Sequence, residues 1–402
     1  MKSEFTTKPL SALADIQTGP FGSQLHKEDY VQNGTPIVTV EHLGQKRFTE
    51  QNLPCVSEID KERLSKYILR EGDVVFSRVG SVDRCSYVSR EYNGWMFSGR
   101  CLRVRPCIEI DSQYLYYYFT LESTKQFVRG IATGATMPSI NTKFMGEVPI
   151  AYPPIDEQRK IATVLSALDN KIELNDKINK NLLQQALAVY KAWFCDYILS
   201  DGVFPESWHI TTVDALSSLV TRGIAPKYDD SSNQIVLNQK CIRDHTIDVS
   251  LARRHLPKKI DEKWICKGDL LINSTGTGTL GRVAQVWFDA NNMTVDSHVT
   301  IVRPKSSILQ SYIGFWGFSH ESEIEAQHTG STGQTELPRD RVKAMELPLP
   351  DEDTLSKFNE LVIPMTDAVV SNQKENARLT QLRDTLLPKL MSGELDVSDI
   401  EI

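Results

Sequence analysis

The chain repeats itself once, and this duplication constrains its fold more than any other feature of its 402 residues. The segment Gly72-Asp73, which opens an apolar run, returns 196 residues later as Gly268-Asp269. In the same way, Val104-Arg105-Pro106 returns 198 residues later as Val302-Arg303-Pro304. Short matches in the same order at an almost constant offset indicate a duplicated structural unit. The sequence therefore predicts two similar domains, here called head 1 (residues 1–152) and head 2 (residues 200–349).

A long helix is predicted after each head, within residues 153–199 and 350–402. The first segment begins with prolines and an acidic turn, which favour a helix start, and then runs for more than thirty residues without Gly or Pro. Apolar residues alternate at spacings of three and four, as in a coiled coil, and the pattern recurs 197 residues later. The seam predicted on the two helices comprises Leu165, Leu168, Ile172, Asn175, Asn179, Leu182, Val362, Met365, Val369, Asn372, Asn376 and Leu379.

Both seams carry two asparagines at matching positions. A buried amide costs stability unless it finds a hydrogen-bond partner, so one hypothesis is that the asparagines pair across the helices and fix their register. The alternative is that both helices expose this stretch to water. Two such helices packed antiparallel would hold the heads at opposite ends, related by an approximate two-fold axis, in an α+β fold. Pro364 and Arg383 depart from the first copy, so the second helix is expected to start late or to bend.

Composition limits the kinds of protein that this chain can be. The N-terminus has no apolar signal region and no run approaches membrane-spanning length, so we expect a soluble, cytoplasmic protein. Residues 1–150 hold 18 basic and 17 acidic residues, whereas residues 351–402 hold 5 and 11, which places the net negative charge in the tail. Seven scattered cysteines form no Cys-x-x-Cys pair, so we predict neither a metal nor a cofactor.

One segment resembles a nucleotide-binding motif. Gly276, Gly278 and Gly281 have the spacing G-x-G-x-x-G after an apolar strand. That motif needs a helix to open at its third glycine, but the residues after Gly281 alternate like a strand. We therefore predict a β-hairpin loop here and no catalytic motif elsewhere. The competing hypothesis is an autonomous nucleotide-dependent methyltransferase that uses this loop.

Three loops in each head share a frame and differ in their polar side chains. They are the hairpin loop, a Gly-rich loop near the start of each head, and the loop that follows a repeated Thr-Gly before the final strand. Arg suits guanine edges, and Asn or Gln suits adenine edges, in the major groove of DNA. The alternative is that these are ordinary solvated loops. The candidate DNA-binding residues are Gln24, Lys27, Ser77, Arg78, Arg84, Asn141, Lys143, Lys227, Asn273, Ser274, Thr275, Arg282, Gln334, Arg339 and Arg341.

Residues around the end of head 1 resemble a known family. Val148 to Ile161, followed by Leu165 to Asn175, looks like the central conserved region of the specificity subunits of type I restriction-modification systems, and Leu386 to Leu395 looks like the C-terminal one. The resemblance implies a non-catalytic reader of double-stranded DNA. Each head, a target recognition domain, would read one half of a bipartite asymmetric site. The helices would set the spacing and dock two methyltransferase (modification) subunits, to which restriction subunits that translocate DNA can be added. A protein scaffold that does not bind DNA is a further alternative.

Overall fold

The computed structural model describes residues 5–134, 136–256, 259–330 and 335–397. The chain forms two compact units, Met1–Glu173 with Ala377–Ile402 (unit 1) and Leu174–Asn376 (unit 2). Each unit therefore contains one head and a segment of each long helix. The predicted α+β class, with two similar mixed domains and two long helices, is confirmed.

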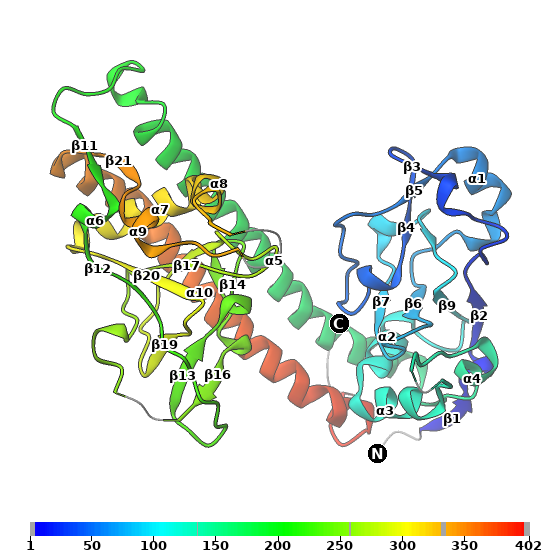
Figure 1. Ribbon diagram of the computed structural model, residues 1–402. Helices are drawn as coiled ribbons and strands as arrows, with labels where there is room; N and C mark the ends of the chain where they lie inside the picture. The colour runs from blue at the N-terminus through cyan, green and yellow to red at the C-terminus, as the bar shows by residue number, and fades with distance from the viewer. Residues whose placement is uncertain (1–4, 135, 257–258, 331–334, 398–402) are drawn as a thin grey trace. The chain divides into compact units, whose positions relative to one another are not determined.

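Unit 1 is built on two four-stranded sheets. One has the strand order β2-β9-β6-β7 and the other β3-β5-β4-β8, while β1 pairs with β10 (Figure 1). The strands are β1 (Thr6–Pro9), β2 (Ala14–Thr18), β3 (Tyr30–Val31), β4 (Thr35–Val38), β5 (Cys55–Val56), β6 (Val74–Ser77), β7 (Cys85–Tyr87), β8 (Met96–Phe97), β9 (Cys101–Pro106) and β10 (Pro149–Tyr152). The helices of the head are α1 (Glu58–Arg63), α2 (Ser112–Thr120), α3 (Glu122–Ile131) and α4 (Thr142–Gly146).

Unit 2 repeats this plan strand for strand in its main sheet. The order β12-β20-β17-β18 matches that of unit 1, and β11 pairs with β21 as β1 does with β10. The strands are β11 (His209–Thr212), β12 (Ser217–Arg222), β13 (Gln234–Leu237), β14 (Ile242–Arg243), β15 (Thr246–Ile247), β16 (Arg253–His255), β17 (Leu270–Asn273), β18 (Val283–Gln285), β19 (Met293–Val295), β20 (Val299–Pro304) and β21 (Glu346–Leu349). The helices of the head are α6 (Val213–Leu216), α7 (Gln310–Ser319), α8 (Glu321–Ala326) and α9 (Arg339–Lys343).

The repeated Gly-Asp and Val-Arg-Pro segments form the same buried ion pair in both heads. Arg105 donates from Nε and Nη2 to the two carboxylate oxygens of Asp73, both at 2.7 Å, and Arg303 does the same to Asp269, both at 2.8 Å. Both carboxylates are 1% exposed. Burial raises the pKa of Asp269, and the hydrogen bonds to the carboxylates raise the pKa of both arginines. A bidentate pair of this kind is directional, so it ties the start of one central strand to the end of its neighbour and explains why the two segments recur together.

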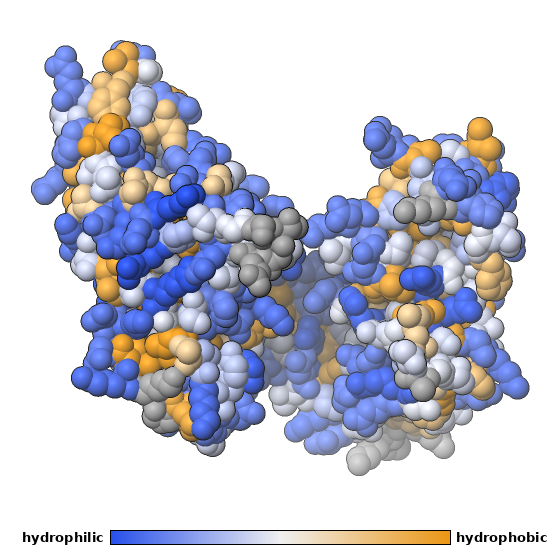
Figure 2. Space-filling model, viewed as in Figure 1, coloured by the Kyte–Doolittle hydropathy of each residue, from blue (hydrophilic) through white to orange (hydrophobic). Residues whose placement is uncertain are grey.

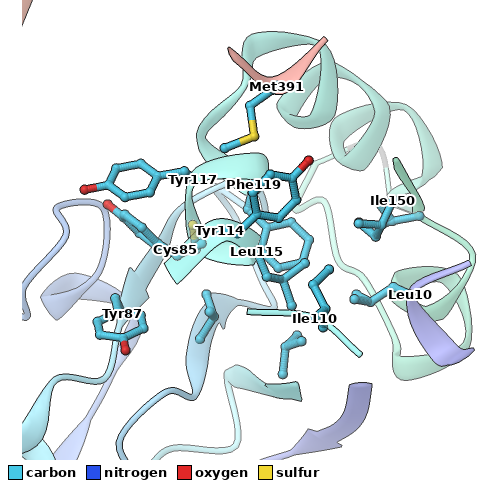
Figure 3. Packing of buried hydrophobic residues seen from close by; sticks show 14 of the residues in the cluster. Leu10, Cys85, Tyr87, Ile110, Tyr114, Leu115, Tyr117, Phe119, Ile150 and Met391 are labelled. Atoms are coloured by element: carbon cyan, nitrogen blue, oxygen red, sulfur yellow. The ribbon is translucent and has the colours of Figure 1, made fainter. Parts of the chain in front are cut away.

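A tyrosine-rich helix forms the centre of the unit 1 core. In α2, Tyr114 is fully buried and Phe119 is 1% exposed, and Figure 3 shows Met391 from the C-terminal helix lying toward these aromatic side chains. Leu165 of the first long helix belongs to the same cluster. Head 1 is therefore not closed by its own residues alone, because both long helices complete its hydrophobic core.

The two long helices are α5 (Ile155–Phe194) and α10 (Glu352–Met391), and each is 40 residues long (Figure 1). The expectation that the second helix starts late is wrong, since α10 begins at Glu352 and continues through Pro364. Proline removes one backbone donor from a helix interior, but Pro364 is exposed here, where water can satisfy the carbonyl that it leaves unpaired.

Both predicted asparagine pairs lie between α5 and α10 within unit 2. Asn175 donates to the Oδ1 of Asn376 at 2.8 Å, and Asn372 donates to the Oδ1 of Asn179 at 2.8 Å. Residue numbers rise along α5 as they fall along α10, so the helices are antiparallel here. Near the start of the seam Leu165 and Asp169 of α5 are buried, whereas Leu168 is half-buried.

Candidate DNA-binding interface

Two of the three predicted loops meet in head 1. The hairpin loop between β6 and β7 is joined to the loop before α4, because the N–H of Ile140 donates to the carbonyl of Arg78 at 3.0 Å. A second bond runs from the N–H of Gly80 to the carbonyl of Pro138 at 2.8 Å. These backbone bonds hold the two loops side by side whatever side chains they carry.

Arg78 connects this pair to the Gly-rich loop that follows β2. Its Nη1 donates to the carbonyl of Gly99 at 3.0 Å, and its guanidinium lies 5.8 Å from the ring centre of Phe21. The Gly-rich loop approaches so closely that a Cβ on Gly19 would lie 2.1 Å from the carbonyl oxygen of Ser98. Only glycine fits there, which explains the glycine at the start of this loop.

Head 2 places its three loops in the same way. The N–H of Leu337 donates to the carbonyl of Ser274 at 2.8 Å, as Ile140 does to Arg78 in head 1. A Cβ on Gly223 would lie 2.0 Å from the carbonyl oxygen of Val295, as at Gly19. The predicted hairpin is confirmed, because β17 and β18 pair antiparallel on either side of the loop that contains the three glycines.

A different arginine connects the loops of head 2. Arg222, the last residue of β12, forms an ion pair with Glu336 and donates from Nη2 to the carbonyl of Leu337 at 2.7 Å. At the position of Arg78, head 2 has Ser274, whose hydroxyl lies 2.6 Å from that of Thr300. The arginine that connects the loops therefore follows β6 in head 1 but is the last residue of β12 in head 2.

Three of the candidate DNA-binding residues lie inside the heads. Ser77 is 1% exposed, and Asn273 and Ser274 are fully buried. Their polar groups are used locally, since Ser77 donates to the carbonyl of Val79 at 2.9 Å and Asn273 donates to that of Gln239 at 3.1 Å. In this conformation the three side chains have almost no surface that DNA could contact, so they support the loops from within.

Other candidates use their polar groups to fix the loops. Asn141 caps α4 by accepting from the N–H of Phe144 at 2.8 Å, and Arg84 donates to the carbonyl of Leu43. The remaining three behave similarly: Gln24 accepts from Tyr67, Thr275 bonds to His298, and Arg341 donates to the carbonyls of Gln327 and His328.

A last group of candidates faces solvent. Lys143, Lys227 and Arg339 are exposed and Arg282 is half-buried. The backbone of Lys27 opens a 3-10 helix, Lys27–Asp29, and Gln334 lies outside the described residues. In head 2 these basic side chains come from two of the three loop regions and from α9, whereas in head 1 Lys143 of α4 is the one member of this group.

Sequence reasoning missed the partners at the two junctions. Phe21, which is 54% exposed, and Glu336 lie within segments that the repeat had marked as variable, but neither was singled out. Arg222 and Glu336 are 114 residues apart in the chain, so no local pattern connects them. Only the pairing of β12 with β20 brings Arg222 to the loops.

In the view of Figure 2, hydrophilic residues cover most of both units, and apolar residues form small separate areas. Among the described residues, no group of three or more His, Cys, Asp or Glu side chains could hold a metal ion. No helix in the described part of the chain is long and apolar enough to cross a membrane.

Comparison with known proteins gives one consistent family. Residues 2–184 match the family model described as the type I restriction modification DNA specificity domain. The type I restriction enzyme MjaIX specificity subunit of Methanocaldococcus jannaschii is 27% identical, over 99% of this chain and 95% of that protein. The HindI specificity subunit of Haemophilus influenzae is 22% identical, over 90% of this chain and 95% of that protein.

A solved structure agrees with the fold. The S subunit of a type I restriction-modification system from M. genitalium superposes with a TM-score of 0.60 at 16% identity, covering 97% of this chain and 96% of that one. The family model reaches through head 1 into α5, and the relatives extend the similarity over head 2, where the same frame recurs. The first part of the chain thus matches the type I restriction modification DNA specificity domain, and nearly the whole chain is similar to type I restriction enzyme specificity subunits.

Proposed function

We propose that this chain reads a bipartite, asymmetric sequence in double-stranded DNA, with head 1 contacting one half-site and head 2 the other. The observation that carries the proposal is the loop junction, which has the same backbone frame in both heads and different side chains on it. A shared frame with different polar groups suits two readers of different sequences, because base edges are distinguished by the donors and acceptors presented to them.

The basic side chains around each junction support contact with the DNA backbone. We propose that Lys143 in head 1, and Lys227, Arg282 and Arg339 in head 2, contact phosphates or base edges. Phosphate contacts position a protein on DNA and base contacts specify the sequence. Because the chain as a whole is acidic, at −7, we propose that partner subunits supply much of the phosphate binding.

The two long helices are proposed to set the distance between the half-sites and to dock two methyltransferase subunits. Restriction subunits would join the complex through these partners. In this assignment the chain has no catalytic activity of its own. The asparagine pairs between α5 and α10 support a fixed helix register in unit 2, as a spacer function requires.

The experiment that tests the proposal is to express this chain with the modification subunits of its own system in a host that lacks them. Mapping of methylated bases across the host genome should then reveal one asymmetric motif with two specific parts and a non-specific gap. Omission of this chain should abolish that methylation. A continuous motif, or methylation without this chain, would contradict the proposal.

Exchange of one head sharpens the test. Replacement of residues 1–152 with the corresponding head of another family member should change one half of the motif and leave the other half and the gap unchanged. Insertion of one heptad in each long helix should change only the gap or abolish assembly. A change in both half-sequences after exchange of head 1 would overturn the modular assignment.

The alternative of an autonomous methyltransferase gives a different result in a simple measurement. The purified chain alone should not bind S-adenosylmethionine in isothermal titration, because the glycine-rich loop joins two antiparallel strands and does not open a helix. Stoichiometric binding by the chain alone would favour that alternative.

A further inference from the structure

The ion pair at the loop junction of head 2 has the features of a base-reading group. Arg222 and Glu336 come from β12 and from the loop before α9, and their side chains are 27% and 55% exposed. They line an open depression of about 460 Å³ together with Lys263, Arg339 and Asp340. The Glu336 carboxylate is thus presented at the surface, beside three basic side chains and one further carboxylate, where the proposed interface lies.

The backbone of Glu336 is held in place on both sides. Its N–H and carbonyl are bonded to Thr329 at 2.9 and 2.7 Å, and it bridges to Thr275 of the hairpin loop. The next residue, Leu337, is fully buried and bonded to Ser274. Little freedom is left to the position of the Glu336 Cα, so its side chain projects from a rigid platform.

Arg222 reduces the repulsion that the Glu336 carboxylate would experience next to DNA phosphates. An unpaired carboxylate near phosphates is repelled, whereas an ion pair with Arg222 offsets its charge and orients it. The guanidinium contacts Oε1, and its Nη2 is fixed at the same time on the carbonyl of Leu337. Within the described part of the chain, Oε2 of Glu336 accepts no hydrogen bond, which leaves it available to a donor.

Head 1 has the same backbone here without the ion pair. Thr18 occupies the position of Arg222, since it pairs with Leu102 of β9 as Arg222 pairs with Thr300 of β20. Ser139 occupies the position of Glu336, with the same two bridges to the neighbouring loops. The frame is therefore stable with small neutral residues, and the charged pair in head 2 is not needed to close the loops.

We propose that Glu336 is a specificity-determining residue of head 2, which accepts a hydrogen bond from the exocyclic amino group of a base in the major groove, and that Arg222 is its positioning residue. Carboxylates pair with the N4 amino group of cytosine, so cytosine is the expected base. This inference rests on the proposed function and adds to it the residue that reads one base pair.

The test uses the full chain with its modification subunits and reads the methylated motif. Glu336→Gln replaces one acceptor oxygen with a donor and removes the charge. We expect discrimination at one base pair of the half-site read by head 2 to fall by about tenfold or more, while every position of the head 1 half-site stays the same. Arg222→Lys should lower the extent of methylation at the unchanged motif, because the second contact, to Leu337, is lost.

Two controls separate reading from folding. Glu323→Gln changes an exposed carboxylate on α8 and should leave the motif unaltered, and thermal melting of each variant shows whether head 2 is folded. An unaltered motif in a folded Glu336→Gln variant, or loss of discrimination in both half-sites, would overturn the inference. If the unmodified chain directs no bipartite methylation, the proposed function fails instead, so the two failures are distinguishable.

Discussion

Head 1 and head 2 pack against their own segments of α5 and α10 with contrasting side chains. In unit 1 the contact contains a charged cluster, defined as Lys46, Tyr117, Asp169 and Arg383. Asp169 is 7% exposed and accepts from the Tyr117 hydroxyl at 2.6 Å and from Nη1 of Arg383 at 2.8 Å. The Nζ of Lys46 lies 4.0 Å from the same carboxylate, and burial lowers the pKa of this lysine.

Unit 2 has neutral residues at three of these positions, namely Phe315, Thr366 and Ala186 for Tyr117, Asp169 and Arg383. Its contact is instead an aromatic cluster, defined as Tyr190, Phe194, Tyr312 and Phe358. The ring centre of Phe194 lies 5.2 Å from that of Tyr190 and 5.0 Å from each of the other two.

The charged cluster and the aromatic cluster are expected to stabilise their units to different extents. Aromatic rings bury large apolar areas and stabilise wherever they pack. A buried ion pair gains little over an apolar pair of equal volume, but removal of one partner is costly. We infer that the aromatic cluster contributes much of the free energy of unfolding of unit 2. The charged cluster contributes little net stability to unit 1, but loss of one of its members is costly because it leaves a buried charge unpaired.

Two buried thiols allow the stability of each unit to be followed separately. Burial raises the pKa of Cys85 in unit 1 to about 12 and that of Cys241 in unit 2 to about 11. Thiolates are the reactive form, so at pH 8 these two cysteines should be alkylated only when their unit opens. Exposed Cys107 and Cys266 should react at once. Rapid alkylation of Cys85 or Cys241 in the folded chain would contradict the assignment.

The largest expected effect is in the aromatic cluster. Phe194→Ala should lower the free energy of unfolding of unit 2 by about 4 kcal/mol, through lost apolar burial and the cavity left behind. Alkylation of Cys241 should accelerate accordingly, while that of Cys85 should not. The matched substitution in unit 1 is Met391→Ala, which should cost about 2 to 3 kcal/mol. Equal costs in both units would remove the contrast between them.

The next effect is loss of one partner from the charged cluster. Arg383→Met keeps the apolar stem but leaves Asp169 without its closest cation, and should destabilise unit 1 by about 3 kcal/mol. This cost is at the low end of the range of about 3 to 5 kcal/mol for removal of one partner from a buried ion pair, because Lys46 remains nearby and Arg383 is 29% exposed. Alkylation of Cys85 during denaturant titration measures it, and a cost below about 1 kcal/mol would show that Asp169 is satisfied without Arg383.

Removal of the whole cluster should cost less than removal of one member. The substitutions Asp169→Thr, Tyr117→Phe and Arg383→Ala give unit 1 the neutral residues of unit 2, and Lys46→Met removes the remaining charge of the cluster. We expect stability within about 1 kcal/mol of the original, since uncharged replacements of buried ion pairs are often neutral. A variant as unstable as Arg383→Met would mean that the cluster is needed for stability itself.

Much of this architecture could be predicted from the sequence, because it repeats. The two heads, the hairpin around Gly276 and the long helices all follow from local patterns that occur twice. The late helix start suggested by Pro364 was wrong because packing of the surrounding residues maintains a helix that local propensity disfavours. Arg383 departs from the repeat, and the structure explains this departure because Arg383 donates a hydrogen bond to the buried carboxylate of Asp169.

The candidate site was predicted less well. Polar residues at strand ends, such as Asn273, were predicted to contact DNA, but Asn273 is buried and holds the loops together from within. The residues that meet at the surface, Arg222 and Glu336, come from distant segments that only the folded sheet brings together. Loop location could therefore be predicted from the repeat, whereas the direction of each side chain required the tertiary structure.

The smallest effect expected of a single substitution lies in the asparagine seam of unit 2. Asn179→Leu leaves the amide of Asn372 unpaired and should cost about 1 to 2 kcal/mol, whereas leucine at both positions should restore or slightly raise stability. Polar residues in a seam fix the register of the two helices. The double variant should therefore lose the single register and not the stability. Cysteines introduced in facing positions of α5 and α10 should cross-link only in the native register in the original chain, and also in shifted registers in the double variant. If the double variant keeps a single cross-linking register, the Asn179–Asn372 pair is not needed for the alignment, which the Asn175–Asn376 pair and the apolar neighbours Val369 and Leu182 then maintain.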